Sequence, residues 1–159
     1  MNSSWTCGTI PAITLWEPWA TWIAAGLKTI ETRGHANFAW LAGKRIAIHA
    51  SKRFDKYAAA AVGSNKWNGH DILRLARACA DLWPSLDGWP LGCVVCTAFV
   101  REARWLTAAD SPEALCDCGP DRFGLVLADV RVLANPLPWR GGQGVWRLPV
   151  GALPLECVA

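Results

Sequence analysis

Residues 16–33 read WEPWATWIAAGLKTIETR. This stretch predicts a short helix followed directly by a strand that carries charged side chains. Pro18 suits a first helical turn, where the amide hydrogen that it lacks would have no intrahelical acceptor. Gly26 suits the left-handed position just past a helix end. Together they predict a helix of about two turns. Its large apolar side chains lie at i, i+3 and i+4 and are expected to pack on a core: Trp19, Trp22 and Ile23.

The segment after Gly26 changes to the two-residue period of a strand. If Ile30 marks the buried side of this strand, Glu31 and Arg33 face outward together. Lys28 lies so close to the helix end that strand alternation does not decide whether it joins them. As surface residues, these charges would form an ion-pair network worth less than about 1 kcal/mol. In a partly desolvated cleft, the same charges could do chemistry.

A second strand is expected over residues 45–50, because apolar and polar side chains alternate there. Ile46 and Ile48 point to the core in this reading, and His49 points to the opposite face. His49 could act as a general acid or as a hydrogen-bond donor to a base. The alternative is a histidine whose hydrogen bonds are satisfied inside the core.

A helical hairpin is expected over residues 53–83. Ser51 suits the N-cap of its first helix. Lys52 and Arg53 would then lie at a helix start, whose free backbone amides form a ready anion site. The alternative is that both cations are ordinary solvated surface. Apolar residues at helical spacing indicate the second helix, which ends before Pro84.

The remainder of the chain is expected to be mostly extended. Three more strands are indicated, at residues 92–105, 123–137 and 145–149. Residues 34–44 are expected to form a loop over the mouth of a cleft. Residues 107–122 are rich in turn signals, and Ser111-Pro112-Glu113 is typical of a one-turn helix start.

Bulk properties limit the class of protein. A chain of 159 residues fits one domain, which we place at residues 10–155 after a loose N-terminal tail at residues 1–9. The odd count of seven cysteines, with no secretory signal, indicates a reducing cytoplasmic setting. No apolar run is long enough to span a bilayer, so no membrane partner is expected. The net charge of +3 permits a polyanionic partner without requiring one.

Several chemistries are disfavoured by the motifs. Cys93 and Cys96 lie three apart in a predicted strand, so their side chains face opposite ways and do not chelate a metal. We therefore expect reduced thiols and no metal. The sequence contains no GxSxG elbow, Walker loop or dinucleotide fingerprint, so no nucleotide cofactor is expected. Eleven tryptophans are the compositional outlier; most should fill the core, and the remainder are candidates to stack on nucleobases.

Three stretches match one known pattern in the correct order. They are ITLWEPWATWIAAGLKTIETR at 13–33, RIAIHASKR at 45–53 and NPLPWRGGQGVWRLP at 135–149. They resemble the ASCH (activating signal cointegrator homology) family of the PUA-like superfamily. The resemblance implies an α+β fold, a small mixed β-barrel with flanking helices and a helical-hairpin insertion. It also implies a cleft bordered by the strand after Lys28, and RNA or a modified nucleoside as partner.

The resemblance also implies an enzymatic alternative. Small bacterial ASCH proteins are amidohydrolases that act on acylated cytidine, using a Lys of a GxKT stretch, a Thr three residues later and a downstream Glu. Lys28 matches the Lys, whereas Glu31 stands where the Thr would be and Glu102 is a loose counterpart of the downstream Glu. In this reading Lys28 is the base, Glu31 or Glu102 is the acid, and Thr29 or Thr32 supplies a hydroxyl. A ribonuclease-like ASCH protein is a further alternative.

The function that we favour from the sequence is a binding module rather than an enzyme. Aromatic and basic residues are interleaved in three loop regions, as in sites that bind single-stranded nucleic acid. In this hypothesis, Glu31 reads the edge of a base. The stacking candidates are Trp16, Trp40 and Trp139, and the phosphate-binding candidates are Arg33, Lys52, Arg53 and Arg140.

Overall fold

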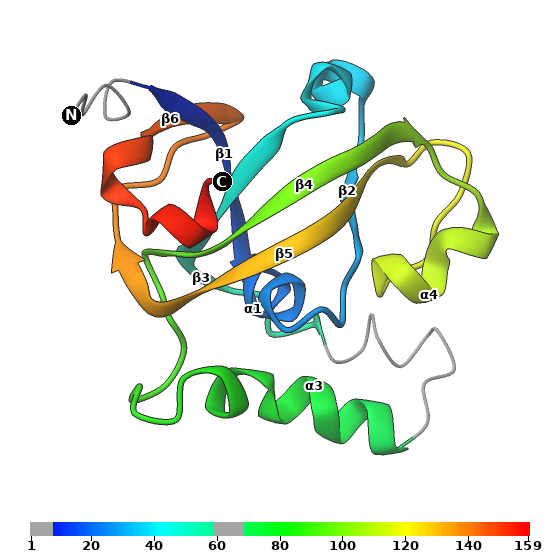
Figure 1. Ribbon diagram of the computed structural model, residues 1–159. Helices are drawn as coiled ribbons and strands as arrows, with labels where there is room; N and C mark the ends of the chain where they lie inside the picture. The colour runs from blue at the N-terminus through cyan, green and yellow to red at the C-terminus, as the bar shows by residue number, and fades with distance from the viewer. Residues whose placement is uncertain (1–7, 59–68) are drawn as a thin grey trace.

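The computed structural model describes residues 8–58 and 69–159, which form an α+β fold around a six-stranded mixed sheet (Figure 1). The strands are β1 (Thr9–Glu17), β2 (Ile30–Arg33), β3 (Arg45–Phe54), β4 (Cys93–Trp105), β5 (Phe123–Pro138) and β6 (Val145–Pro149). Their order across the sheet is β2-β5-β4-β3-β1-β6. Strands β1 and β3 are parallel, and all other neighbours are antiparallel. The predicted α+β class is therefore confirmed.

The sheet is open, whereas the prediction was a small mixed β-barrel. Strand β2 pairs with β5 over four residues, and β6 pairs with β1 over five. These two short strands are the edges of the sheet in the described structure, and they do not pair with each other. The barrel prediction was wrong in this detail because two such short edge strands leave the two ends of the sheet apart.

The helices are short apart from one. They are α1 (Trp19–Ala24), α3 (Gly69–Leu82) and α4 (Ser111–Ala114), with 3-10 turns η1 (Ala36–Leu41), η2 (Ala108–Asp110), η3 (Val150–Ala152) and η4 (Leu155–Cys157). Figure 1 shows α3 running below the sheet, on the side where α1 lies. Among the helices of the described residues, none is long and apolar enough to cross a membrane.

Helix α1 forms where the sequence predicts it. Pro18 is its N-cap, and Gly26 follows its end with a φ of +72°, a value that an L side chain rarely adopts. Trp22 and Ile23 are buried in the core, as expected. Trp19 is only partly buried, because its indole reaches the pocket described below. Trp22 also donates its indole N–H to the Leu75 carbonyl of α3 at 2.9 Å, which joins the two helices.

The hairpin prediction needs correction at its first helix. Strand β3 continues to Phe54 and pairs there with Glu17 of β1, so Arg53 is in a strand and not at a helix start. The Ser51 hydroxyl accepts a local bond from the Arg53 amide at 3.0 Å instead of capping a helix. The rest of that predicted helix partly lies in residues 59–68, outside the described residues. Helix α3 is the second helix of the prediction, and Trp83 after it is buried.

The core lies on both faces of the sheet. Ile13 and Leu15 of β1 belong to the cluster that packs against α1 and α3, whereas Ala12 belongs to the cluster under the C-terminal turns. Alternate residues of one strand are therefore buried on opposite sides. Thr9, which the prediction placed in the N-terminal tail at residues 1–9, begins β1. Residues 1–7 lie outside the described part of the chain.

Candidate functional site

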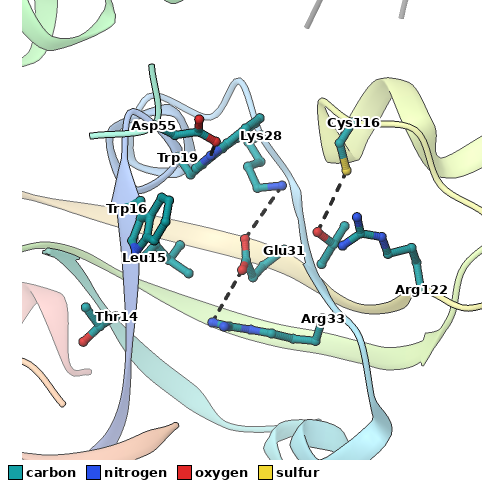
Figure 2. A pocket seen from close by; sticks show the side chains of 11 residues that line it. Thr14, Leu15, Trp16, Trp19, Lys28, Glu31, Arg33, Asp55, Cys116 and Arg122 are labelled. Carbon is teal, nitrogen blue, oxygen red and sulfur yellow. Dashed lines mark hydrogen bonds and ion pairs between the residues drawn. The ribbon is translucent and has the colours of Figure 1, made fainter. Parts of the chain in front are cut away.

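A pocket of about 420 Å³ lies between the edge strand β2, the end of β1, helix α1 and the segment after α4 (Figure 2). We call it the Glu31 pocket. Its lining residues are Thr14, Leu15, Trp16, Trp19, Lys28, Glu31, Thr32, Arg33, Asp55, Cys116 and Arg122. The volume is in the range of small-molecule sites in proteins.

Lys28 lies at one end of the pocket and is almost completely buried. Its amide closes the end of α1 by donating to the Trp22 carbonyl at 3.0 Å, which turns the side chain away from the helix. The Nζ donates to the carbonyls of Ile30 and Ala114, at 2.7 and 2.6 Å. Two of its three N–H groups are therefore used by the backbone, and one remains for the pocket. Burial lowers the pKa of Lys28, and the negative charge of Glu31 partly opposes that effect.

Glu31 is placed between two cations. Its Oε2 lies 3.7 Å from Lys28 Nζ, and its Oε1 lies 3.4 Å from Arg33 Nη2. Figure 2 shows the carboxylate in the centre of the pocket, with the two cations on opposite sides. The Arg33 guanidinium stacks over the Phe38 ring, with its Cζ 4.7 Å from the ring centroid. Its Nε and Nη2 make no hydrogen bond to any described residue.

The walls of the pocket are aromatic on one side and polar on the other. Trp16 is 48% exposed, and Arg53 lies over its ring at 5.6 Å. Trp19 donates its indole N–H to Asp55 Oδ2 at 3.1 Å. A large flat indole is therefore open to a ligand beside the carboxylate.

Three titratable lining residues were missed as site candidates by the sequence analysis: Asp55, Cys116 and Arg122. Asp55 reaches the pocket because β3 is longer than predicted. Cys116 and Arg122 come from the segment after α4, and the Cys116 Sγ lies 3.9 Å from the Thr32 hydroxyl. No local signal marks these residues, because the pairing of β2 with β5 brings their segment to the pocket.

A second cavity of about 810 Å³ adjoins the first, and we call it the His49 cavity. Lys52, Trp139 and Arg140 line it together with His49. His49 Nε2 donates to the Trp139 carbonyl at 2.9 Å, and its Nδ1 has no partner among the described residues. Burial lowers the pKa of His49, and the bond to Trp139 partly opposes that effect. The Gly141 backbone packs so closely on the imidazole that a Cβ there would lie 2.5 Å from Nδ1.

A third cavity, the Phe38 cavity, has a volume of about 730 Å³. It lies beside η1, in the segment predicted to form a loop over the cleft mouth. Arg33 and Arg122 line both this cavity and the Glu31 pocket. Trp40 is 45% exposed on its wall, with Arg147 over the ring at 5.6 Å.

Two of the predicted catalytic residues lie away from the pocket. Glu102 is on β4 and pairs with Arg104 on the exposed surface, with Glu102 Oε2 3.1 Å from Arg104 Nε. Thr29 donates its amide to the Glu113 carbonyl at 3.0 Å and does not line the described pocket. Among the described residues, no group of three or more His, Cys, Asp or Glu side chains could hold a metal ion.

Comparison with solved structures identifies the fold. No protein-family model matches the chain, and no curated protein matches it. The structure is similar to that of the ASCH protein from Zymomonas mobilis, with a TM-score of 0.55 and 16% sequence identity over 89% of both chains. It is also similar to a tyrosine-to-phenylalanine mutant of that protein, with a TM-score of 0.50 and 13% identity over 89% of this chain and 91% of the other. The chain therefore has the fold of an ASCH domain.

Proposed function

We propose that the protein binds RNA or a modified nucleoside by taking a single base into the Glu31 pocket. The observation that carries the proposal is a carboxylate fixed between two cations directly beside a half-exposed indole. The Trp16 ring offers a stacking surface to one face of a base. Glu31 offers an acceptor for a ring or exocyclic N–H group of that base.

The hydrogen bonds of Lys28 support a positioning role for this residue in binding. With two N–H groups held by backbone carbonyls, its ammonium directs the third toward Glu31. The Glu31 oxygens are then held in place as acceptors for a base edge with an N–H group.

The proposal is tested by NMR titration of the Trp16 indole N–H signal, which is assigned by its loss in Trp16→Phe. The ligands are the four common ribonucleosides, N4-acetylcytidine and a ten-nucleotide single-stranded RNA of mixed sequence. At least one is expected to shift the signal saturably, and Glu31→Gln should weaken that ligand about tenfold, since one base-edge contact is worth about 1–3 kcal/mol. The indole signal of Trp105, which is 52% exposed outside the described pockets, should stay unchanged. No saturable shift with any ligand would overturn the proposal.

A second candidate function is hydrolysis of an N-acylated cytidine, which is favoured by the buried Lys28 Nζ lying 3.7 Å from the Glu31 carboxylate in one pocket. In this reaction Glu31 takes a proton from water as the water oxygen adds to the acyl carbon. This exchanges the roles given by the resemblance, in which Lys28 is the base, because Lys28 Nζ already donates to two backbone carbonyls. The C–N bond then breaks, and the proton passes to the leaving amine. Lys28 supplies its remaining N–H to the carbonyl oxygen as charge develops there.

The assay for hydrolysis is chromatographic release of cytidine from N4-acetylcytidine. Glu31→Gln should abolish release, and Glu102→Gln should leave it unchanged because Glu102 lies outside the pocket. Absence of turnover by the wild-type protein, or equal turnover by Glu31→Gln, would remove this candidate.

A further inference from the structure

The three cavities adjoin one another through shared lining residues, and we call them together the groove. The Glu31 pocket and the His49 cavity share Thr14. The Glu31 pocket and the Phe38 cavity share Thr32, Arg33 and Arg122, and the two flanking cavities share Gln143. A ligand that occupies the Glu31 pocket therefore lies next to both of the other cavities.

Carboxylates line only one of the three cavities in the described structure. Glu31 and Asp55 are both in the Glu31 pocket, which also contains the cations of Lys28, Arg33 and Arg122. Among the described residues that line the flanking cavities there is no Asp or Glu. Their Lys and Arg residues are Lys52 and Arg140 in the His49 cavity, and Arg33 and Arg122 in the Phe38 cavity.

The wall of the His49 cavity is held by hydrogen bonds rather than being a free loop. The Trp139 amide donates to the Gly92 carbonyl at 3.0 Å, while its carbonyl accepts from His49. Gly141 packs directly on the imidazole. Arg140 lies between these two anchored residues, so its cation is presented to the cavity from a fixed backbone.

On the other side, Arg33 has donors that no described residue satisfies. Its Nε and Nη2 lack a hydrogen-bond partner, although Nη2 lies 3.4 Å from Glu31. A phosphate oxygen is the strongest acceptor that a guanidinium meets in biology, and it is bound in a forked geometry. Arg122 lines the same cavity and adds a second cation.

We propose that the ligand is a single-stranded oligonucleotide that lies along this groove, with one base in the Glu31 pocket and a phosphate in each flanking cavity. The phosphate on one side meets Lys52 and Arg140, and the phosphate on the other meets Arg33 and Arg122. A nucleotide chain alternates uncharged bases with anionic phosphates, which matches a pocket that contains both carboxylates beside cavities whose described lining has Lys and Arg but no Asp or Glu. This inference rests on the proposed base-binding function and extends it from a single nucleoside to a chain.

The test compares three ligands by NMR titration at several salt concentrations. They are a nucleoside that the pocket accepts, a ribotrinucleotide with that base in the centre and two phosphates, and the same trinucleotide with uncharged methylphosphonate links. For single strands, log Kd changes by about 0.7 per neutralised phosphate for each unit of log salt. The phosphate-linked trinucleotide should therefore show a slope of about 1.4, which is about a sevenfold loss of affinity between 50 and 200 mM salt. The nucleoside and the methylphosphonate trinucleotide should show almost no dependence of affinity on salt.

Two variants separate the two sides of the groove. Arg122→Ala should reduce the slope to about 0.7, and so should the double variant Lys52→Ala/Arg140→Ala. The matched control is Arg74→Ala/Arg77→Ala, which removes two exposed cations from α3. These substitutions are all at exposed positions, and circular dichroism checks that each variant is folded.

The outcomes distinguish this inference from the base-binding proposal. If the nucleoside, the methylphosphonate and the phosphate-linked trinucleotide bind equally at all salt concentrations, the groove does not bind phosphates and the base pocket stands. The same conclusion follows if the α3 control lowers the slope as much as the groove variants do. If none of the three ligands shifts the Trp16 signal, base binding itself is wrong and the groove inference falls with it.

Discussion

Glu17, at the end of β1, is a fully buried carboxyl group whose protonation should control the stability of this fold near neutral pH. Its Oε2 accepts from the Thr21 amide at 3.0 Å, and its Oε1 lies 2.7 Å from the Thr21 hydroxyl. Burial raises its pKa from the ordinary value of 4.5 to about 7, more than the two bonds to Thr21 lower it. The folded protein therefore holds a proton at Glu17 that the unfolded chain has already lost by pH 6.

The sign and size of the effect follow from proton linkage. A folded-state pKa of about 7 against 4.5 in the unfolded chain favours folding by about 3 kcal/mol below pH 4.5, and this contribution disappears as the pH rises above 7. Between pH 5.5 and pH 8 the loss is about 2 kcal/mol. His49 acts in the opposite direction, because burial lowers its pKa and stability falls as the pH decreases through 6.5. The comparison below uses two proteins that both contain His49, so the contribution of His49 is the same in each and cancels in their difference.

The perturbation is Glu17→Gln, which resembles the protonated acid. The Gln oxygen can accept from the Thr21 amide while its NH₂ donates to the Thr21 hydroxyl, so the local bonding is kept. Urea denaturation at pH 5.5 and pH 8 gives the free energy of unfolding of each protein. From pH 5.5 to pH 8, the free energy of unfolding of the wild type should fall by about 2 kcal/mol more than that of the variant. Glu156→Gln, at an exposed position, is the control and should behave as the wild type. The reasoning is refuted if Glu17→Gln shows the same pH dependence as the wild type.

Two further substitutions test the packing around the groove. Lys28→Met removes a buried ammonium and leaves two carbonyls without a donor. The free energy of unfolding, measured by urea titration, should therefore fall by about 3 kcal/mol. The control is Lys44→Met at an exposed position, which should change it very little. A fall of less than about 1 kcal/mol would contradict the burial argument. Gly141→Ala pushes a Cβ into the His49 ring. It should lower the free energy of unfolding by about 1–3 kcal/mol and lower the melting temperature accordingly. Gly119→Ala, with no neighbour within 4 Å, is its control, and equal values for the two variants would argue against the close contact.

The sequence predicts α1 and β2 well because short-range chemistry determines them. A proline at the helix start and a glycine that needs positive φ at its end act within a few residues of themselves. Strand β3 was predicted too short for the opposite reason. Its last residues are extended because Phe54 pairs with Glu17 of β1, 37 residues earlier in the chain. Serine and basic residues carry a helix-start signal that this long-range pairing overrides.

The candidate site was predictable only in part. Glu31 and Arg33 share a face through simple strand alternation, and the structure places them in contact. The direction of Lys28 depends on the carbonyl of Ala114, which is 86 residues away in sequence. Glu102 looked like a partner from its position on a later strand, but the register of β4 with β5 directs it to the surface. Side-chain direction at such positions is decided by tertiary pairing, which a single sequence does not reveal.

The acid in the middle of the groove gives the proposed site its selectivity. A pocket lined only by cations would accept a phosphate as readily as a base, and the ligand could then bind in several registers. The Glu31 carboxylate lies at the centre of the pocket, where it disfavours a phosphate, while Trp16 favours a flat uncharged ring. Lys28 and Arg33 hold that carboxylate in place, and Asp55 adds a second carboxylate to a lining that also contains the cation of Arg122. The arrangement therefore fixes which part of a nucleotide chain enters the pocket before any base-edge contact is made.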